Sequence, residues 1–248
     1  MSETIGQRFQ AETAIARLGV SDQKRGMPMP PLEVRLFDGR EIDLPGVDAA
    51  WGKTPLSSAM RSRRSVREYS DAPLSLAELS DLLWATQGVD RVWENVVTFR
   101  SVPSAGARHA FETLLAVNRV EGLPAGLYQY LAHEHRLLGT SSSFSVASSE
   151  LAAACLGQKA IENAAVTFVW VAVRERMTWR YGDRGYRYLY LDAGHACQNL
   201  YLACEAMGAG ACAIGAYDDA ATNALLHLDG ADRFVIYLAS VGKRTVLA

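Results

Sequence analysis

A run of ten residues dominated by apolar side chains, 164–173, limits what this chain can fold into more than any other feature. The run is far shorter than the roughly 20 residues that a helix needs to cross a bilayer, so it predicts a buried strand. The composition around it, with 49% apolar residues, is ordinary for a globular protein and excludes disorder or a fibre. We expect one domain, because a chain of 248 residues can bury a sizeable core.

Other patterns predict helices and strands that alternate along the chain. Ser75 and Glu78 form a capping-box pattern at the start of a helix that Gly88 ends. Apolar residues recur every three or four positions over 186–207, which predicts a long helix that is central or lies in a subunit interface. Strands are expected at 113–118, 126–130, 211–216 and 234–238, and a further helix at 218–228.

The strands at 113–118 and 126–130 are joined by a short turn and are therefore expected to pair antiparallel. Hairpin-like pairs of this kind favour a mixed α+β fold, a mostly antiparallel sheet flanked by helices, over a doubly wound fold. Residues 1–53 differ from the rest. They combine a polar amphipathic stretch, a proline-rich segment and, at 33–36, a weak strand or an extended arm. We expect an N-terminal extension followed by a main domain at 54–248.

Charge and cysteine content exclude several classes of protein. The net charge is −2, which leaves no global field to attract nucleic acid or an anionic membrane. The four cysteines, Cys155, Cys197, Cys204 and Cys212, include no C-x-x-C pair and are interpreted as small buried residues rather than metal ligands or disulfides. The polar N-terminus has neither the basic nor the apolar region of a secretory signal, which predicts a cytoplasmic protein.

The densest chemical feature is an arginine cluster at 61–67, with four arginines and two serines in seven residues. Guanidinium groups bind phosphate oxygens bidentately, and a serine hydroxyl adds a further hydrogen bond. The cluster therefore indicates a phosphate grip. The alternative, equally favoured by the spacing, is a solvated basic face at the end of a helix, where cations interact well with the helix dipole.

Three more segments are candidates for a ligand site. Residues 103–108 are small and precede a strand, so the backbone there is able to approach a flat ligand. Residues 208–216 are rich in glycine and alanine but follow a helix, which disfavours a Rossmann pyrophosphate site. Lys243 and Arg244 form a second cationic spot after the last strand. Each segment is weak alone, and an ordinary turn or packing role is the alternative.

In this order the motifs resemble those of the FMN-dependent nitroreductase superfamily, over about 56–244, roughly three quarters of the chain. The branch that they resemble most is the streptolysin-S-biosynthesis (SagB-type) dehydrogenases, which include azoline oxidases. The residues that carry the resemblance are 63–69, 103–107, 121–128, 184–188, 192–200 and 208–216. Six motifs in the same order are hard to obtain by chance.

The resemblance implies a homodimer of the nitroreductase fold with FMN at the subunit interface. The residues that would hold the FMN phosphate and ribitol are Arg63, Arg64, Ser65 and Arg67, with Lys243 or Arg244 completing the anion site. Those along the two sides of the isoalloxazine would be Pro103, Ser104 and Gly106 on one side, and Ala213, Ile214 and Gly215 on the other.

The implied activity is an FMN-dependent oxidoreductase that passes hydride or electron pairs by ping-pong chemistry from NADH, NADPH or a substrate to a small-molecule acceptor. An azoline oxidase that acts on a modified peptide and passes electrons to oxygen is the enzyme alternative. Tyr181 matches that branch, but Arg180 replaces its lysine, and arginine effectively cannot act as a base. Arg180 is still able to orient an anionic substrate. A non-catalytic flavin-binding or interaction protein is the third alternative.

The histidines are interpreted separately. His195 shares a helix face with Asp192 and is expected to be a core histidine rather than a proton donor. His133 and His135 follow a strand and are expected to be exposed. His109 lies close to the segment expected to face the flavin, where contact with substrate is a hypothesis.

Overall fold

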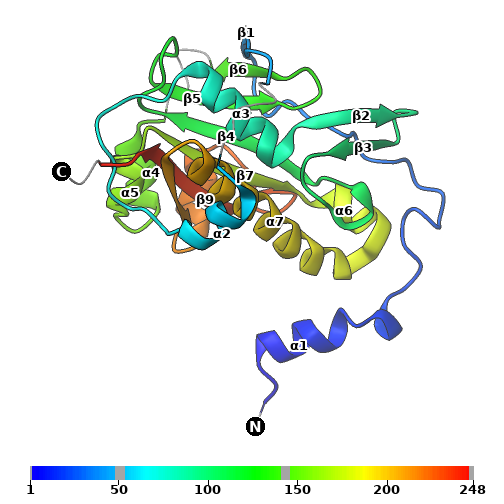
Figure 1. The fold of residues 1–248 in the computed structure, drawn as a ribbon. Coiled ribbons are helices and arrows are strands. Elements are labelled where there is room, and N and C mark those ends of the chain that lie inside the picture. The colour runs from blue at the N-terminus through cyan, green and yellow to red at the C-terminus, as the bar shows by residue number, and fades with distance from the viewer. Residues whose placement is uncertain (1, 48–53, 141–145, 246–248) are drawn as a thin grey trace.

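The computed structural model describes residues 2–47, 54–140 and 146–245. Its centre is a seven-stranded sheet in the order β1-β6-β5-β4-β7-β9-β8, in which all six neighbouring pairs are antiparallel (Figure 1). The strands are β1 (Gly39–Asp43), β4 (Phe111–Val117), β5 (Gly126–Leu131), β6 (Arg136–Thr140), β7 (Val166–Val173), β8 (Ala209–Ile214) and β9 (Arg233–Lys243). The predicted antiparallel sheet is therefore confirmed.

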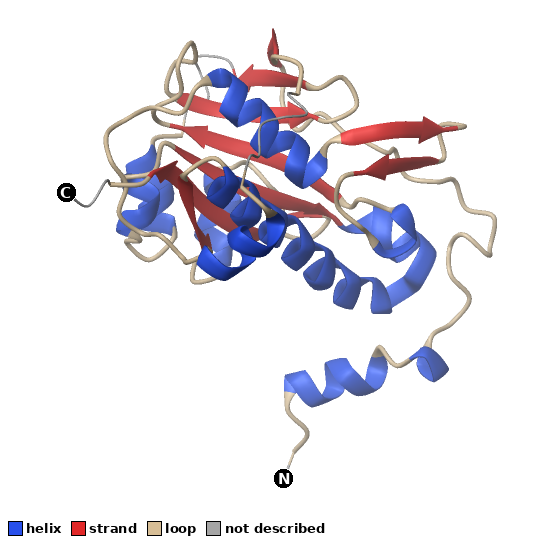
Figure 2. Cartoon of the chain, viewed as in Figure 1, coloured by secondary structure: helices blue, strands red, loops and turns tan. Residues whose placement is uncertain are grey.

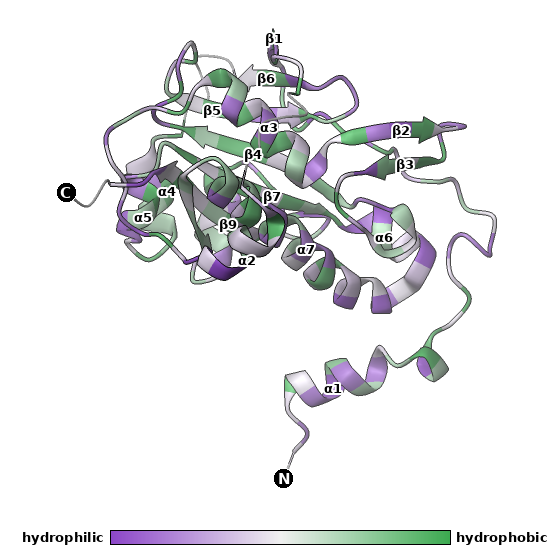
Figure 3. Ribbon diagram, in the orientation of Figure 1, coloured by the Kyte–Doolittle hydropathy of each residue, from purple (hydrophilic) through white to green (hydrophobic). Residues whose placement is uncertain are grey.

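The apolar run at 164–173 forms β7, which is buried along its whole length between β4 and β9. Phe168 and Trp170 pack into the core on one face of the sheet, and Val169 and Val171 pack into the core on the other. Because helices cover both faces, the strand shows no polar alternation. Figure 3 colours most of β4 and β7 green, for hydrophobic residues.

The helices form a layer on each face of this sheet (Figure 2). One layer contains α2 (Leu56–Ser62), α3 (Leu76–Gln87), α6 (Arg174–Tyr181) and α7 (Gly185–Ala206). The other contains α4 (Ser148–Ala154), α5 (Lys159–Glu162) and α8 (Asp219–Leu225). The long helix α7 lies across the first face and carries most of the contacts described below.

Local signals place several elements as predicted. The Ser75 side chain accepts a hydrogen bond from the Glu78 amide, and the Glu78 carboxylate accepts one from the Ser75 amide, which confirms the capping box of α3. The helix ends at Gly88, as expected.

Two other elements end at different residues than predicted. Helix α8 ends at Leu225, three residues earlier than predicted, whereas β9 continues five residues past the predicted 238 because both β7 and β8 pair with it. All four cysteines are buried, which confirms the prediction that they are small buried residues.

The N-terminal segment runs along the outside of the main body, with α1 (Ile5–Glu12) at its far end, where Arg187 of α7 donates to the Gln10 carbonyl (Figure 1). The alternative of an extended arm at 33–36 is the one observed, because side chains rather than a strand hold it. Glu112 accepts a hydrogen bond from the Val34 amide at 2.9 Å, and Gln129 bonds to both Val34 and Leu36. The strand of this region is β1, at Gly39–Asp43.

Two further features concern boundaries. Residues 89–100 contain the hairpin of β2 (Val89–Trp93) and β3 (Val97–Arg100), which projects from the main sheet (Figure 1). The predicted domain boundary at residue 53 lies outside the described residues. None of the helices in the described part of the chain is long and apolar enough to cross a membrane.

Candidate active site

The arginine cluster begins in the last turn of α2, which ends at Ser62. Arg64 donates hydrogen bonds to the carbonyls of Arg61 and Arg63 at 3.0 and 2.9 Å, so its guanidinium satisfies carbonyls where the helix ends. Arg64 thus fits the basic-helix-end alternative. In the described part of the chain, the side chains of Arg61, Arg63 and Arg67 make no ion pair.

Tyr201 of α7 joins this cluster to β8. Its hydroxyl lies 2.9 Å from the Ser65 hydroxyl and accepts a hydrogen bond of 2.7 Å from the Ala213 amide. The Arg63 guanidinium stacks over its ring, with the central carbon 5.1 Å from the ring centroid. The Val66 amide also donates to the Ala211 carbonyl at 2.9 Å. Arg63, Ser65 and Ala213, which lie far apart in the sequence, are therefore neighbours, and the sequence reasoning missed the tyrosine that unites them.

Lys243 and Arg244 lie next to this region, because Arg244 bridges to Tyr69 as an extension of β9. Both cations have carboxylate partners within the chain: Lys243 pairs with Glu78, and Arg244 pairs with Glu205. Arg244 also donates to the Ala209 carbonyl at 2.9 Å. Their positive charges are therefore largely compensated, unlike those of Arg61, Arg63 and Arg67.

The small-residue segment 103–108 is fixed by Asp192 of α7. The Asp192 carboxylate accepts hydrogen bonds from the Ser104 hydroxyl at 2.6 Å and from the Ala105 amide at 3.2 Å. Burial raises the pKa of Asp192, and the Ser104 hydrogen bond opposes that shift. Gly106 has φ of +58°, and Ala107 and His109 are also left-handed, at 51° and 42°. Backbone of this kind in non-glycine residues is concentrated at functional sites.

Arg180 and Tyr181, at the end of α6, pack directly against Gly106. A Cβ atom on Gly106 would lie 2.3 Å from the Tyr181 hydroxyl and 2.9 Å from Arg180 Nε, so no side chain fits at this position. Tyr181 is fixed from the other side by an edge-on contact with Tyr188, with ring centroids 4.7 Å apart. The predicted catalytic pair and the predicted flavin-facing glycine are therefore in contact.

The two groups of predicted residues sit at different turns of α7. Asp192 anchors one group and Tyr201 the other, and nine residues of helix separate them by about 13 Å. The side chain of Ile214 is buried in the core under α4 and α8, whereas Ala213 is half-buried and Gly215 is exposed. The segments expected on the two sides of the isoalloxazine are thus held at separate places within one chain.

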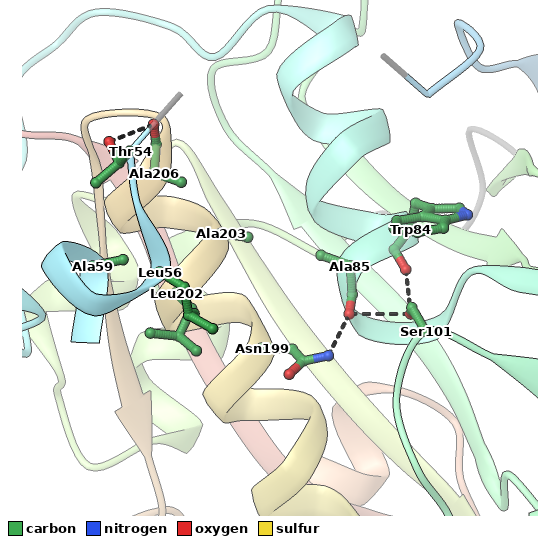
Figure 4. A pocket seen from close by; sticks show the side chains of 10 residues that line it. All are labelled: Thr54, Leu56, Ala59, Trp84, Ala85, Ser101, Asn199, Leu202, Ala203 and Ala206. Atoms are coloured by element: carbon green, nitrogen blue, oxygen red, sulfur yellow. Dashed lines mark hydrogen bonds between the residues drawn. The ribbon is translucent and has the colours of Figure 1, made fainter. Parts of the chain in front are cut away.

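A cavity of about 440 Å³ lies between α2, α3 and α7, beside the Tyr201 end of the site (Figure 4). Its wall contains Trp84, Ala85 and Ser101 on one side and α7 on the other. Asn199 of α7 donates a hydrogen bond of 2.9 Å to the Ala85 carbonyl, and the Ser101 hydroxyl donates to the Trp84 carbonyl at 2.6 Å. These bonds hold the cavity walls in position.

The histidine interpretations need correction. His195 is not a core histidine, because 51% of its side chain is exposed. His133 and His135 are half-buried rather than exposed. The His135 ring bonds to the Tyr130 hydroxyl and to the Ser80 hydroxyl, each at 2.7 Å, which a turn-based prediction cannot anticipate because Ser80 comes from α3. His109 is buried, and burial with the nearby Arg100 lowers its pKa to about 3.

The fold and the site define an α+β protein in which α7 positions both the unpaired arginines and the left-handed segment around Gly106. The sequence model of the Nitroreductase family matches residues 60–243, and the chain belongs to this family. It is therefore an oxidoreductase. It is 35% identical over 207 residues to the "Putative nitroreductase MJ1384" of Methanocaldococcus jannaschii, covering 84% of this chain and 98% of the relative. Its predicted fold is confirmed.

Other similarities are more partial. The chain is 32% identical over 112 residues to the trifolitoxin-processing protein TfxB of Rhizobium leguminosarum, over 44% of this chain and 30% of TfxB. A structure described as a "putative nitroreductase" from Anabaena variabilis has a TM-score of 0.70 and 31% identity, over 84% of this chain and 42% of that one. These matches cover less than half the length of TfxB and of the Anabaena protein.

Two solved structures that share the fold at lower identity carry informative ligands. A nitroreductase-like protein from Desulfovibrio desulfuricans, solved in complex with FMN, has a TM-score of 0.54 and 21% identity, over 78% of this chain and 88% of that one. The Escherichia coli microcin synthetase McbBCD, with truncated pro-MccB17 bound, has a TM-score of 0.61 and 20% identity, over 86% of this chain and 78% of that one.

Proposed function

We propose that this oxidoreductase binds FMN and transfers hydride or electron pairs in turn between a donor, NADH, NADPH or a substrate, and a small-molecule acceptor. The observation that carries the proposal is the group of three arginines, Arg61, Arg63 and Arg67, that have no ion-pair partner in the described chain. Uncompensated guanidinium groups next to the Ser65 hydroxyl fit a phosphate monoester. The FMN-bound structure from Desulfovibrio supports the same cofactor.

The remaining residues fit the rest of the cofactor. Because Gly106 has no side chain, the Tyr181 hydroxyl and the Arg180 side chain lie directly against the segment that we place beside the planar ring system. FMN, when bound, supplies the hydride and electron chemistry, and the chain supplies orientation and electrostatics. Lys243 and Arg244 are ion-paired, so we assign them the supporting role of a positive edge beside the arginine cluster.

The separation of the two groups along α7 supports a homodimer with FMN at the interface. Each isoalloxazine would then contact the Gly106 segment of one protomer and the Ala213 segment of the other. Exposed apolar side chains on α2 and α7 are available for such an interface: Leu56, Met60, Tyr190 and Leu191 are between 59% and 64% exposed. Light scattering on the purified protein tests this, and a monomer that retains FMN would contradict it.

Tyr181 is the residue we assign to proton transfer. Its hydroxyl lies against the Gly106 backbone, at the edge of the proposed flavin position. Arg180 beside it stays protonated and is assigned to orientation of the substrate. We expect Tyr181→Phe to retain FMN and to slow turnover by about 100-fold, a typical effect of removing a proton donor. Unchanged turnover would leave Tyr181 with a packing role only.

Oxidation of azoline rings in a peptide is the second candidate function. It is favoured by the similarity to TfxB, named as a trifolitoxin-processing protein, and by the fold shared with McbBCD. Arg180 disfavours it, because the lysine expected of this branch is absent. Peroxide release from an azoline-containing peptide, compared with its azole product, tests this function directly.

The first experiment is the visible absorption spectrum of the purified protein, followed by identification of the chromophore released on denaturation. A yellow protein that releases FMN and is bleached by NADH or NADPH supports the proposal. A protein that holds FMN but is not reduced by either donor or by candidate substrates favours the non-catalytic alternative. A colourless protein that does not bind added FMN overturns the proposal. A cytoplasmic location stays a prediction.

A further inference from the structure

A second cavity, of about 210 Å³, lies where the N-terminal extension meets the end of α6. The part of this extension that precedes β1 is called the arm below. Ile15, Leu18 and Lys24 of the arm form one wall, and Arg180 and Tyr181 form the other. The cavity therefore adjoins the residue proposed for proton transfer, and it exists only because the arm is held in place. The Gln23 amide donates to the Trp179 carbonyl at 2.9 Å, and Arg187 donates to the Thr13 hydroxyl at 2.6 Å.

Positive charge in this cavity has no compensating acid. Other basic residues of α6 are paired: Arg174 with Asp232 and Arg176 with Glu112. In contrast, neither Arg180 nor Lys24 makes an ion pair with any described residue. Lys24 and Arg180 thus place two positive charges around a small cavity whose lining contains no carboxylate, an arrangement that attracts an anion.

Arg108 lies outside the cavity wall but close to Arg180, and its guanidinium stacks over the Trp179 ring, 5.2 Å from the ring centroid. Its side chain is only 1% exposed, yet its Nε and Nη2 atoms have no hydrogen-bond partner among the described residues. Burial lowers the pKa of Arg108, and the nearby charge of Arg180 lowers it further. Because Arg180 is a like charge nearby, Arg108 adds to the positive charge at this end of α6.

We propose that this cavity binds the carboxylate of a small substrate, with Lys24 and Arg180 holding the anion beside the Tyr181 hydroxyl and Ile15 and Leu18 contacting its apolar part. The arm is thus a wall of the substrate site, and Lys24 supplies an amine where Arg180 has replaced the expected lysine. That the ligand is the enzyme's substrate rests on the function proposed above, whereas anion binding requires only residues of this chain.

Isothermal titration calorimetry on the full chain tests the proposal, with benzoate as the probe and benzamide as its uncharged counterpart. We expect benzoate to bind at least tenfold more tightly than benzamide. Lys24→Ala and Arg180→Met are each expected to weaken benzoate binding about tenfold, the usual effect of losing one charged hydrogen bond. Lys159→Ala is the matched control, since Lys159 is also exposed but lies at the start of α5, and it is expected to change nothing.

Several outcomes overturn the proposal. Equal affinities for benzoate and benzamide would show that the cavity does not recognise charge. Equal losses of benzoate affinity in Lys24→Ala and Lys159→Ala would show that the anion responds to the net charge of the protein and not to this cavity. Because Lys24 is exposed on the arm, its substitution leaves folding intact. Titration with FMN is run separately. Benzoate binding without FMN binding keeps the anion site and removes the proposed function, whereas FMN binding without benzoate binding removes the anion site alone.

Discussion

Arginine occurs in two contrasting settings in this molecule. At the end of α2, Arg61 and Arg67 are exposed, Arg63 is half-buried, and none of the three pairs with a described carboxylate. Under the arm, Arg176 is fully buried, pairs with Glu112 and donates to the Pro31 carbonyl at 2.6 Å. The same side chain thus offers its charge to a ligand in one region and satisfies the chain's own acceptors in the other.

Whether a group of arginines binds a ligand or supports the fold therefore depends on whether their guanidinium groups are already ion-paired, and not on how many arginines there are. The buried pair also joins three parts of the chain: the arm, β4 and α6. Glu112 of β4 accepts a hydrogen bond from the Val34 amide of the arm and forms an ion pair with Arg176 of α6. Disrupting it should therefore change stability, whereas disrupting the exposed cluster should change ligand binding and leave stability unchanged.

The largest effect is expected from Arg176→Met, which leaves the buried Glu112 carboxylate without its cation. Removing one member of a buried ion pair costs about 3–5 kcal/mol of unfolding free energy. Urea denaturation followed by circular dichroism measures it. The double variant Arg176→Met with Glu112→Leu is the control, and it should recover much of the loss because the two opposite charges of the pair are removed together. A single-variant loss below about 1 kcal/mol would contradict a structural role.

The exposed cluster should behave in the opposite way. Arg67→Ala and Arg63→Ala are each expected to weaken FMN binding by about thirtyfold, or about 2 kcal/mol, with little change in unfolding free energy. Arg64→Ala is the matched control, since its guanidinium already bonds the carbonyls of Arg61 and Arg63. Fluorescence titration with FMN gives the affinities. If Arg64→Ala loses as much FMN affinity as Arg67→Ala, the distinction by pairing fails.

The free energy of unfolding is expected to depend on pH through the buried His109. Burial and Arg100 lower the pKa of His109 to about 3 in the folded state, against about 6.5 when unfolded. The unfolded chain therefore takes up a proton first as the pH falls, and stability is lost from about pH 6.5 downwards. Between pH 6.5 and pH 5 the loss from this group is about 1.5 kcal/mol. His109→Asn, which tolerates the left-handed backbone, should show a correspondingly flatter pH profile, and parallel profiles would exclude His109 as the cause.

The smallest effect is expected from Tyr201→Phe, which removes the hydroxyl bonded to Ser65 and Ala213. A neutral hydrogen bond contributes about 1 kcal/mol, so FMN affinity should fall about fivefold. Tyr190→Phe on the same helix is the control, because Tyr190 is 60% exposed and makes no hydrogen bond within the described chain. Equal affinities in the two variants would show that Tyr201 does not position the arginine cluster.

Elements with strong local signals were predictable from the sequence. The capping box and Gly88 define α3, and the apolar run defines β7, because both signals depend on neighbouring residues alone. Strand β1 was missed since its polar residues make an edge strand, held by β6 and by pairs such as Arg136 with Glu41. Nothing within the segment itself marks those contacts.

The site was predictable in its residues but not in its connections. Family motifs named Arg63, Ser65 and Gly106, whereas Tyr201 and Asp192, which fix them, act through contacts across the fold. Lys24 was invisible for the same reason, because only the folding back of the arm brings it to Arg180. Long-range pairing of this kind requires the three-dimensional structure.

The position of β9 has a consequence for how the protein is made. This strand, Arg233–Lys243, is the last in the described chain, yet it lies between β7 and β8. During synthesis β8 emerges from the ribosome before β9, which connects it to the sheet. The backbone groups of β8 that bond to β9 therefore stay unpaired until β9 has been made. The domain can acquire its native sheet only after residue 243 has emerged, so the sheet is not completed strand by strand in the order of synthesis.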